Sequence, residues 1–144
     1  YLCPADYHCV HSPLDGKIGK ATHIPGELWP GNSWSVRCIK NLFPRSERLV
    51  VELDYQGKRA ILVMVGATNV GKMTLAFDES FVTNDLSHCE PRFRVYSPPI
   101  EIKRGDAFGK FHLGSTVVML YQEGILPKDL VVRAGPVKYG ASLC

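Results

Sequence analysis

Long apolar runs and a strong charge of either sign are both missing from this sequence. None of its apolar stretches approaches the roughly 20 residues that a membrane-spanning helix needs. Lysine and arginine total 17, and aspartate and glutamate total 14, which gives a net charge of +3. That excess is too small for a dedicated nucleic-acid surface. We therefore expect no nucleic-acid partner and no membrane crossing in this segment, whereas an anionic ligand or a lipid headgroup is compatible with the charge.

Cysteine pairs with zinc-binding spacing are also absent. The five cysteines stand at positions 3, 9, 38, 89 and 144, and no two of them form a Cys-x-x-Cys couple. An odd number of cysteines cannot pair completely within one chain. We therefore expect reduced, partly buried thiols in a reducing compartment, and neither a disulfide scaffold nor a structural zinc site.

Glycine and proline are plentiful, at 13 and 10 residues, in a composition that is otherwise ordinary for a globular protein. The 144 residues suffice for one hydrophobic core. Frequent turn formers favour many short strands over long helices. The sequence thus predicts a single domain over residues 1–144 that is mainly β, a sandwich or barrel-like fold with glycine-cornered hairpins and one or two short helices.

Runs rich in β-branched residues locate the expected strands. Residues 48–55 and 58–65 flank Gln56-Gly57 and predict a hairpin. Further strands are expected at 70–77, 81–83, 117–121 and, after a break at Pro98-Pro99, 100–102.

Two glycine corners and one helix complete the expected elements. Residues 102–109 and 132–140 each contain spaced glycines, and each predicts a strand that turns and returns. The helix is expected over 33–43, and Pro44 should end it.

Residues 66–73 resemble a phosphate-binding loop in their first seven positions. The eighth position needs a hydroxyl that binds magnesium, and Met73 has none. The residues after Lys72 have the pattern of a strand, although a phosphate-binding loop opens a helix. We interpret the segment as a glycine turn before a strand, with Lys72 in solvent.

Two histidines stand three residues apart, at positions 8 and 11, in the sequence Asp-Tyr-His-Cys-Val-His-Ser-Pro. On a strand their side chains would face opposite sides, whereas on a turn they could converge. No third ligand at short spacing completes a zinc site, so we expect no metal. Spacing alone leaves open a structural role and an acid–base pair.

Gly114 and Ser115 precede an apolar strand, but the second glycine of a hydrolase Gly-x-Ser-x-Gly elbow is missing. Segments 1–13, 25–28, 41–48, 65–71 and 109–116 together point to another chemistry. In order and spacing they resemble the phosphatidylserine decarboxylase family over essentially the whole chain. The most specific matches are Asp-Tyr-His-x-x-His-x-Pro and Leu-Gly-Ser-Thr. Pyruvoyl decarboxylases of free aromatic amino acids share much of this pattern.

The resemblance implies an enzyme that cuts its own backbone. Ser115 Oγ would attack the Gly114 carbonyl, and elimination with loss of ammonia would leave a pyruvoyl group at position 115. The products would be chains 1–114 and 115–144, held together without a covalent bond. The pyruvoyl ketone would form a Schiff base with the substrate amine and accept electrons as carbon dioxide leaves.

The same resemblance assigns roles to four residues of the histidine motif. His11 matches the base for self-cleavage, and His8 matches the acid that returns a proton after decarboxylation. Asp6 and Tyr7 are expected to position the two histidines and to contribute to substrate binding.

The implied substrate is phosphatidylserine, and the implied location is the bacterial cytoplasmic membrane or the mitochondrial inner membrane. Lys40, Arg45 and Arg48 are candidates for headgroup contacts, although a solvated basic face explains them equally well. Trp29, Trp34 and Phe43 are candidates either for a lipid interface or for the core. The resemblance leaves open whether the chain forms a homo-oligomer.

Two other functions remain open at this stage. One is a pyruvoyl-dependent decarboxylase of a free aromatic amino acid, and the other is a noncatalytic β-sandwich carrier or binding module.

The sequence departs from the family pattern in one respect. In the family an aspartate upstream of the histidine motif also takes part in self-cleavage, and a sequence that starts at Tyr1 begins after that position. Asp15 in Leu-Asp-Gly follows the motif, and we interpret it as a turn aspartate. A chain that lacks the upstream aspartate should process slowly or not at all. It should give an intact 144-residue band on a denaturing gel, and rapid conversion to two bands would contradict this expectation.

Overall fold

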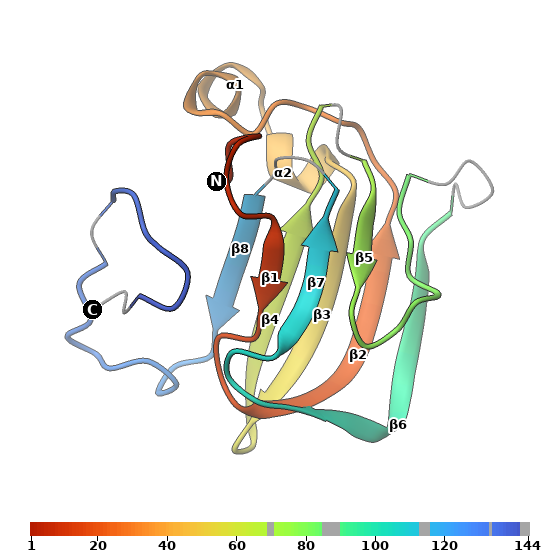
Figure 1. The fold of residues 1–144 in the computed structure, drawn as a ribbon, viewed down its shortest axis with the longest axis vertical. Coiled ribbons are helices and arrows are strands. Elements are labelled where there is room, and N and C mark those ends of the chain that lie inside the picture. Colours follow the sequence, from red (N-terminus) through yellow and green to blue (C-terminus); the bar gives the residue numbers. More distant parts are fainter. Residues whose placement is uncertain (69–70, 85–89, 113–115, 133, 142–144) are drawn as a thin grey trace.

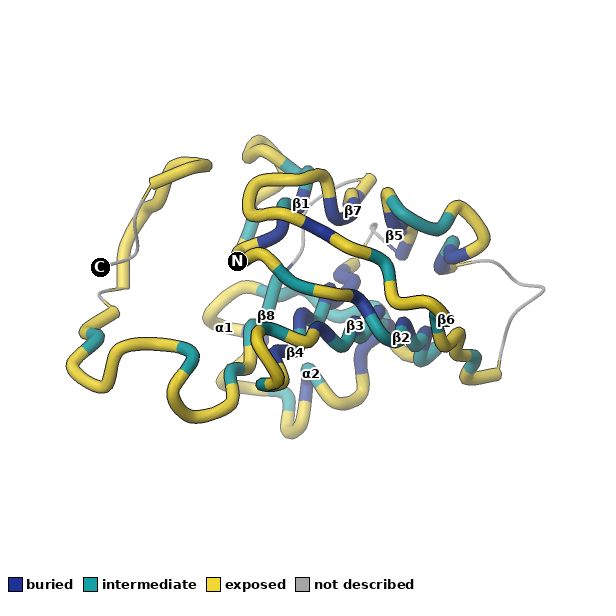
Figure 2. The backbone as a smooth tube through the Cα atoms, turned by 90° about the horizontal axis from the view of Figure 1, so that it is seen from below, coloured by how far each residue is buried: buried dark blue, intermediate teal, exposed yellow. Residues whose placement is uncertain are grey.

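Two antiparallel sheets pack as layers in the computed structural model, which describes residues 1–68, 71–84, 90–112, 116–132 and 134–141 (Figures 1 and 2). The larger sheet has the strand order β6-β2-β3-β4-β8 and the smaller one β1-β7-β5. The mainly β fold with short helices is therefore confirmed. The strands are β1 (Cys9–His11), β2 (Gly16–Ile24), β3 (Arg48–Tyr55), β4 (Lys58–Val65), β5 (Met73–Leu75), β6 (Arg92–Ile102), β7 (Ala107–Phe111) and β8 (Thr116–Tyr121), and the helices are α1 (Ser33–Cys38) and α2 (Leu42–Arg45).

The hairpin predicted from the sequence forms the centre of the larger sheet. β3 and β4 pair without interruption from Arg48↔Val65 to Tyr55↔Lys58. Gln56 and Gly57 have φ angles of 54° and 78°, the two positive values that a tight two-residue turn requires. Alternate residues of both strands are buried, which gives the hairpin one face toward the smaller sheet.

The helix expected over 33–43 is divided into two. Asn32 caps α1, since its side chain accepts a hydrogen bond of 2.9 Å from Ser35 N. α2 contains Pro44, which was expected to end the helix. A proline fits in the first turn because the N–H groups there have no partner within the helix.

Pro98 and Pro99 do not interrupt their strand, so the break predicted there is wrong. Both lie inside β6, an edge strand of the larger sheet. An edge strand tolerates proline because its outward side needs no ladder hydrogen bond. The β2–β6 register also skips from Ile18↔Ile100 to Lys20↔Val95, and this irregularity takes up the residues around the prolines.

Only the first of the two glycine corners forms. Gly105, at φ 87°, lies in the turn between β6 and β7. Residues 122–132 and 134–141 contain no strand, so the second prediction is wrong for the part of that segment that the structure describes. This tail runs beside the edge made by β8 and β1 (Figures 1 and 2).

The core lies between the two sheets. Leu62 and Met64 of β4 share one buried cluster with Phe108 and Phe111 of β7. Gly109 lets the layers approach closely, because a Cβ at this position would lie 2.8 Å from Thr74 O and 2.9 Å from Met64 Sδ.

We expect Phe108→Ala to lower the free energy of unfolding by about 3–5 kcal/mol, because it leaves a cavity between the layers. Urea denaturation measures this change. The matched control is Phe93→Ala on β6, whose side chain is 68% exposed. That change should stay within about 0.5 kcal/mol, and equal losses for the two variants would contradict the layered core.

Candidate functional site

The cleavage segment predicted from the sequence joins the two sheets. β7 in the smaller sheet ends at Phe111, and β8 in the larger sheet begins at Thr116. Gly114 and Ser115 lie outside the described residues. The described residues just before them make two backbone hydrogen bonds. Phe111 N donates to His8 O at 3.0 Å, and His112 N donates to Lys72 O at 3.1 Å.

Two buried polar atoms flank this segment without a hydrogen-bond partner in the described part of the chain. They are His8 Nε2 and Thr116 Oγ1. Thr116 is 9% exposed and faces Gly31, where an added Cβ would come within 2.8 Å of Thr116 Oγ1. Buried polar atoms normally have a partner, so both are available to a group on the segment between them or to a ligand.

His11 has a different environment. Its Nδ1 lies 2.8 Å from Gly105 O, and its Nε2 lies 2.8 Å from the Tyr7 hydroxyl. A carbonyl only accepts, so Nδ1 carries the hydrogen and Nε2 of the neutral ring accepts from Tyr7. The Tyr139 ring packs against the imidazole at a centroid distance of 4.3 Å. His11 is thus fixed in orientation, with a basic nitrogen facing a hydroxyl.

The two histidines lie at opposite ends of β1. The backbone of His8 bonds to Phe111, whereas His11 pairs with Ala107. Three residues of extended chain separate the two histidines, about 10 Å at about 3.3 Å per residue. His8 is therefore at the end of β1 nearer residue 112, and His11 is at the far end.

The aspartates near the motif make backbone contacts. Asp6 Oδ2 accepts from Cys3 N at 2.7 Å, within the turn before β1. Asp15 Oδ1 accepts from Arg104 N at 2.8 Å. The carbonyl that accepts the hydrogen bond from His11 Nδ1 belongs to the next residue, Gly105, so Asp15 supports the turn that holds His11.

The two candidate headgroup arginines already have protein partners. Arg45 pairs with Glu27, at 2.8 and 3.0 Å to the two carboxylate oxygens. Arg48 donates to Pro44 O and Ser46 O at 2.7 and 2.9 Å, and burial lowers its pKa. Both contacts are internal to the protein.

His112, which sequence reasoning passed over, lies on the rim of the cleavage segment. It is exposed, and its Nε2 is 3.3 Å from Thr74 Oγ1. Partial burial and the positive charges of Lys72 and Lys110 lower its pKa. Lys72 is exposed, and strand β5 follows it where a phosphate-binding loop would need a helix. Residues 66–73 therefore do not form a phosphate-binding loop. Lys72 and Lys110 give the rim beside His112 a positive charge.

A buried polar cluster at the same end of the larger sheet was also missed. His23 is 1% exposed and donates from Nε2 to Glu47 Oε1 at 2.9 Å. The same carboxylate accepts from Gly26 N at 2.8 Å and Asn84 N at 3.0 Å. Arg92 Nε approaches His23 Nδ1 at 3.4 Å. The sequence did contain a signal for this cluster. Side chains alternate between the two faces of a strand, so His23 falls on the same face as the buried Ala21, and Glu47 on the same face as the buried Leu49.

The cysteines and carboxylates offer no metal centre in the described residues, where no group of three or more ligand side chains is close enough to hold an ion. Cys3 and Cys38 are exposed and Cys9 is half-buried, all three as free thiols. The expectation of partly buried thiols therefore fits Cys9 alone among these three.

Comparison with known proteins gives one family. The family model described as phosphatidylserine decarboxylase matches residues 1–144. A phosphatidylserine decarboxylase proenzyme of Helicobacter pylori is 43% identical over 144 residues, which cover 99% of this chain and 52% of the relative. One from Anaeromyxobacter is 41% identical over 86% of this chain and 44% of its own length. A mitochondrial proenzyme of Pongo abelii is 37% identical over 90% of this chain and 32% of its own length. The chain spans about half the length of the bacterial relatives that it matches.

The Glu47 contacts generate a pH-dependent prediction. Burial raises the pKa of Glu47, but hydrogen bonds from His23, Asn84 N and Gly26 N outweigh this and leave the pKa below its usual value. The ionised carboxylate therefore stabilises the fold above the ordinary carboxyl pKa of about 4.3, and this stabilisation is lost as the pH falls through the folded-state pKa.

We expect Glu47→Gln to lower the free energy of unfolding by about 1–3 kcal/mol at pH 7, with a difference from wild type that shrinks below about pH 4. Urea denaturation across this pH range measures it. The control is Glu52→Gln, because Glu52 pairs with Lys20 at the surface and should matter little. A loss for Glu47→Gln that is the same at every pH would refute the carboxylate's role.

Proposed function

The chain belongs to the phosphatidylserine decarboxylase family, and we propose that it is the self-cleaving core of an enzyme that converts phosphatidylserine to phosphatidylethanolamine and carbon dioxide. The observation that carries the proposal is the match of the family model to the whole chain. The word proenzyme in the names of the relatives supports activation by processing. The buried His8 Nε2 and Thr116 Oγ1 provide support from the structure, because neither has a partner among the described residues, Thr116 directly follows the proposed cleavage position, and the His8 backbone bonds to Phe111.

Cleavage begins with attack of Ser115 Oγ on the Gly114 carbonyl, which converts the amide to an ester. Elimination across the serine Cα–Cβ bond then frees the Gly114 carboxylate, and hydrolysis of the resulting enamine releases ammonia and leaves the pyruvoyl group. The hydroxyl must lose its proton to attack. Family resemblance assigns this proton to His11, and the accepting Nε2 that faces Tyr7 is the chemical form that a base requires.

The described residues nearest position 115 suit a pyruvoyl group, since neither Thr116 Oγ1 nor His8 Nε2 has a hydrogen-bond partner in the described part of the chain. When formed, this group supplies a ketone that binds the substrate amine and accepts electrons during decarboxylation. His8 returns a proton to the substrate carbon, and its place opposite Phe111 supports that role. Tyr7 orients His11 through their hydrogen bond.

The position of His8 also favours a second assignment for the cleavage step. His8 lies at the end of β1 nearer residue 112, and Nε2 has no partner in the described residues. His11 lies at the far end and has partners at both ring nitrogens. In the second assignment His8 is the base for cleavage as well as the acid for decarboxylation.

After cleavage the chain beginning at position 115 would stay attached through β8. This strand pairs with β4 at six consecutive positions, from Thr116↔Val65 to Tyr121↔Ala60. Noncovalent association of the two product chains therefore needs no rearrangement of the larger sheet.

A phospholipid substrate places the enzyme at a membrane, and the bacterial and mitochondrial relatives favour the bacterial cytoplasmic or the mitochondrial inner membrane. Neither helix described by the structure has the length and apolarity to span a bilayer.

In a polypeptide that includes the upstream aspartate of the family pattern, wild type should give two chains, and we expect Ser115→Ala to remain a single band on a denaturing gel, to lack a ketone that reacts with phenylhydrazine, and to lose all turnover of phosphatidylserine. Ser80→Ala, in an exposed turn, is the control and should process as wild type does. Mass spectrometry of the fragment that begins at position 115 gives the readout. Full turnover by Ser115→Ala would end the proposal. Turnover of free tryptophan in place of phosphatidylserine would favour the amino acid decarboxylase, and neither ketone nor turnover in wild type would favour the noncatalytic module.

Asparagine variants of the two histidines separate the assignments. If His11 is the base, His11→Asn stays uncut, whereas His8→Asn gives two chains and the ketone but decarboxylates at least about 100-fold more slowly. If His8 performs both steps, His8→Asn stays uncut and His11→Asn is processed. Circular dichroism checks that each variant folds. Normal processing and turnover in both variants would exclude both assignments.

A further inference from the structure

The helix α1 presents an apolar side chain that nothing in the described structure covers. Trp34 is 71% exposed and Val36 is 41% exposed, and Ser35 is the buried residue of the helix. The other two candidate aromatics differ. Trp29 is half-buried beneath Arg45, whose guanidinium lies 5.8 Å from its ring, and Phe43 is half-buried in α2. The structure thus singles out Trp34 from the three.

The charged side chains in the sequence segment that contains α1 are all positive. From residue 28 to residue 46 the sequence contains Arg37, Lys40 and Arg45 and no aspartate or glutamate. Arg45 is occupied by Glu27. Arg37 and Lys40 are exposed and have no acidic partner among the residues that the structure describes. An exposed indole, followed three and six residues later by exposed cations that have no acidic partner in the described part of the chain, matches the boundary of an anionic bilayer. There tryptophan enters the headgroup layer and basic residues meet lipid phosphate.

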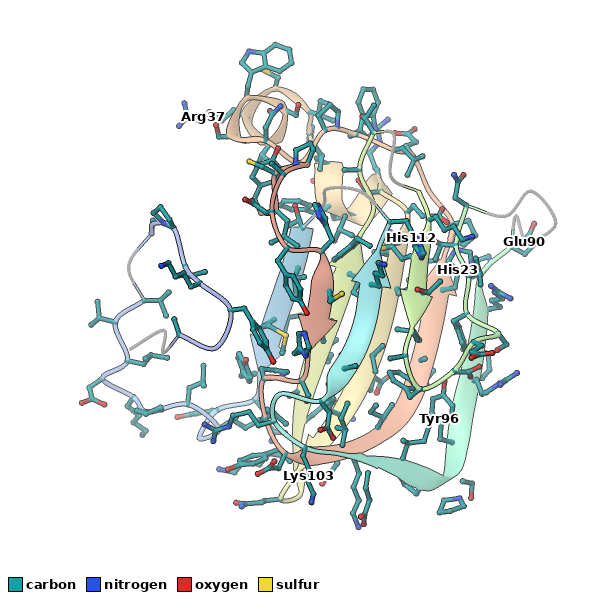
Figure 3. All side chains as sticks on the ribbon, in the orientation of Figure 1. His23, Arg37, Glu90, Tyr96, Lys103 and His112 are labelled. Carbon is teal, nitrogen blue, oxygen red and sulfur yellow. The ribbon has the colours of Figure 1, made fainter. Side chains whose placement is uncertain are left out.

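The same end of the molecule carries the candidate site. Gly31, two residues before α1, is so close to Thr116 that an added Cβ would lie 2.8 Å from Thr116 Oγ1. Thr116 directly follows the proposed pyruvoyl position. Figure 3 shows Arg37 on α1 at one end of the sheets and Lys103 at the opposite end. A bilayer in contact with α1 would therefore lie close to Thr116 and the proposed headgroup site.

We propose that α1, through Trp34, Arg37 and Lys40, is a docking surface for an anionic phospholipid bilayer and brings the site beside Thr116 against the headgroups. This inference rests on the proposed function, since it names the membrane contact of that same site. Docking here lets a phosphatidylserine headgroup reach the site while its acyl chains stay in the bilayer.

Phe93, an exposed aromatic residue on strand β6, is a less suitable membrane anchor than Trp34. Phe93 on β6 is 68% exposed, but Lys20 Nζ lies over its ring at 5.0 Å. Lys20 in turn pairs with Glu52 at 3.7 Å. The cation beside Phe93 is thus neutralised within the protein, and Phe93→Ala provides a control that removes an aromatic of equal exposure.

Binding is measured by co-sedimentation of the protein with phosphatidylcholine vesicles that contain or lack phosphatidylglycerol, an anionic lipid without the substrate's amine. Each basic residue at an anionic surface is worth about fivefold in affinity, so Arg37→Glu with Lys40→Glu should weaken binding to the anionic vesicles more than tenfold. Trp34→Ala should weaken it several-fold. Lys103→Glu with Arg104→Glu, at the opposite end, and Phe93→Ala should bind as wild type does. Equal losses in a test variant and its control, or no loss in the α1 variants, would overturn the proposal.

Activity on two substrates separates failure of this inference from failure of the proposed function. The α1 variants should lose turnover of phosphatidylserine in vesicles but keep turnover of a short-chain phosphatidylserine dissolved as monomers. Loss of both activities in the α1 variants alone would place α1 in catalysis and refute a pure docking role. Absence of both activities in wild type would refute the proposed function, while the sedimentation result would still decide whether α1 binds anionic bilayers.

Discussion

The passage of the chain from one sheet to the other between β7 and β8 is the constraint on which the rest of this structure depends. The backbone leaves the smaller sheet at Phe111 and enters the larger one at Thr116, and the hydrogen-bonded ladders on both sides fix these two points. Four residues, 112–115, lie between them in sequence. For the cleavage proposed at Ser115, fixed points on both sides would reduce the entropy that the attacking and attacked atoms lose when they meet.

A second group of contacts keeps this end of the larger sheet in order. The Glu47 carboxylate receives hydrogen bonds from His23 and from backbone N–H groups at Gly26 and Asn84, and so links the ends of β2 and β3 to two loops. A buried carboxylate without such donors would be costly. The loop that leads through Gly31 to α1 begins at this cluster. The position of α1 over the candidate site is therefore tied to buried electrostatics in the sheet.

Local patterns predicted those parts of the fold that depend on neighbours in sequence. The β3–β4 hairpin followed from two β-rich runs on either side of Gly57, because glycine accepts the positive φ angle of a tight turn. The strand break predicted at Pro98 and Pro99 was wrong because an edge strand can contain proline. That β6 is an edge strand is known only from the complete sheet. For the site, the histidine motif was found by resemblance. The contacts of His8 and His11 could not be predicted, since they depend on the pairing of β1 with β7. The exposure of Trp34 could not be predicted either, since it depends on whether another part of the fold covers α1.

The edge position of β8 has a consequence for how this protein can be assembled. β8 pairs with one neighbour, β4, and no other strand in the described sheet lies beyond it. An outer strand of this kind can be supplied by a separate molecule, since adding a strand to a free edge needs only the backbone of the acceptor. If the chain divides at Ser115 as proposed, the fragment that carries β8 could therefore be made by chemical synthesis and added in trans, with an isotope or an unnatural ketone at its first residue.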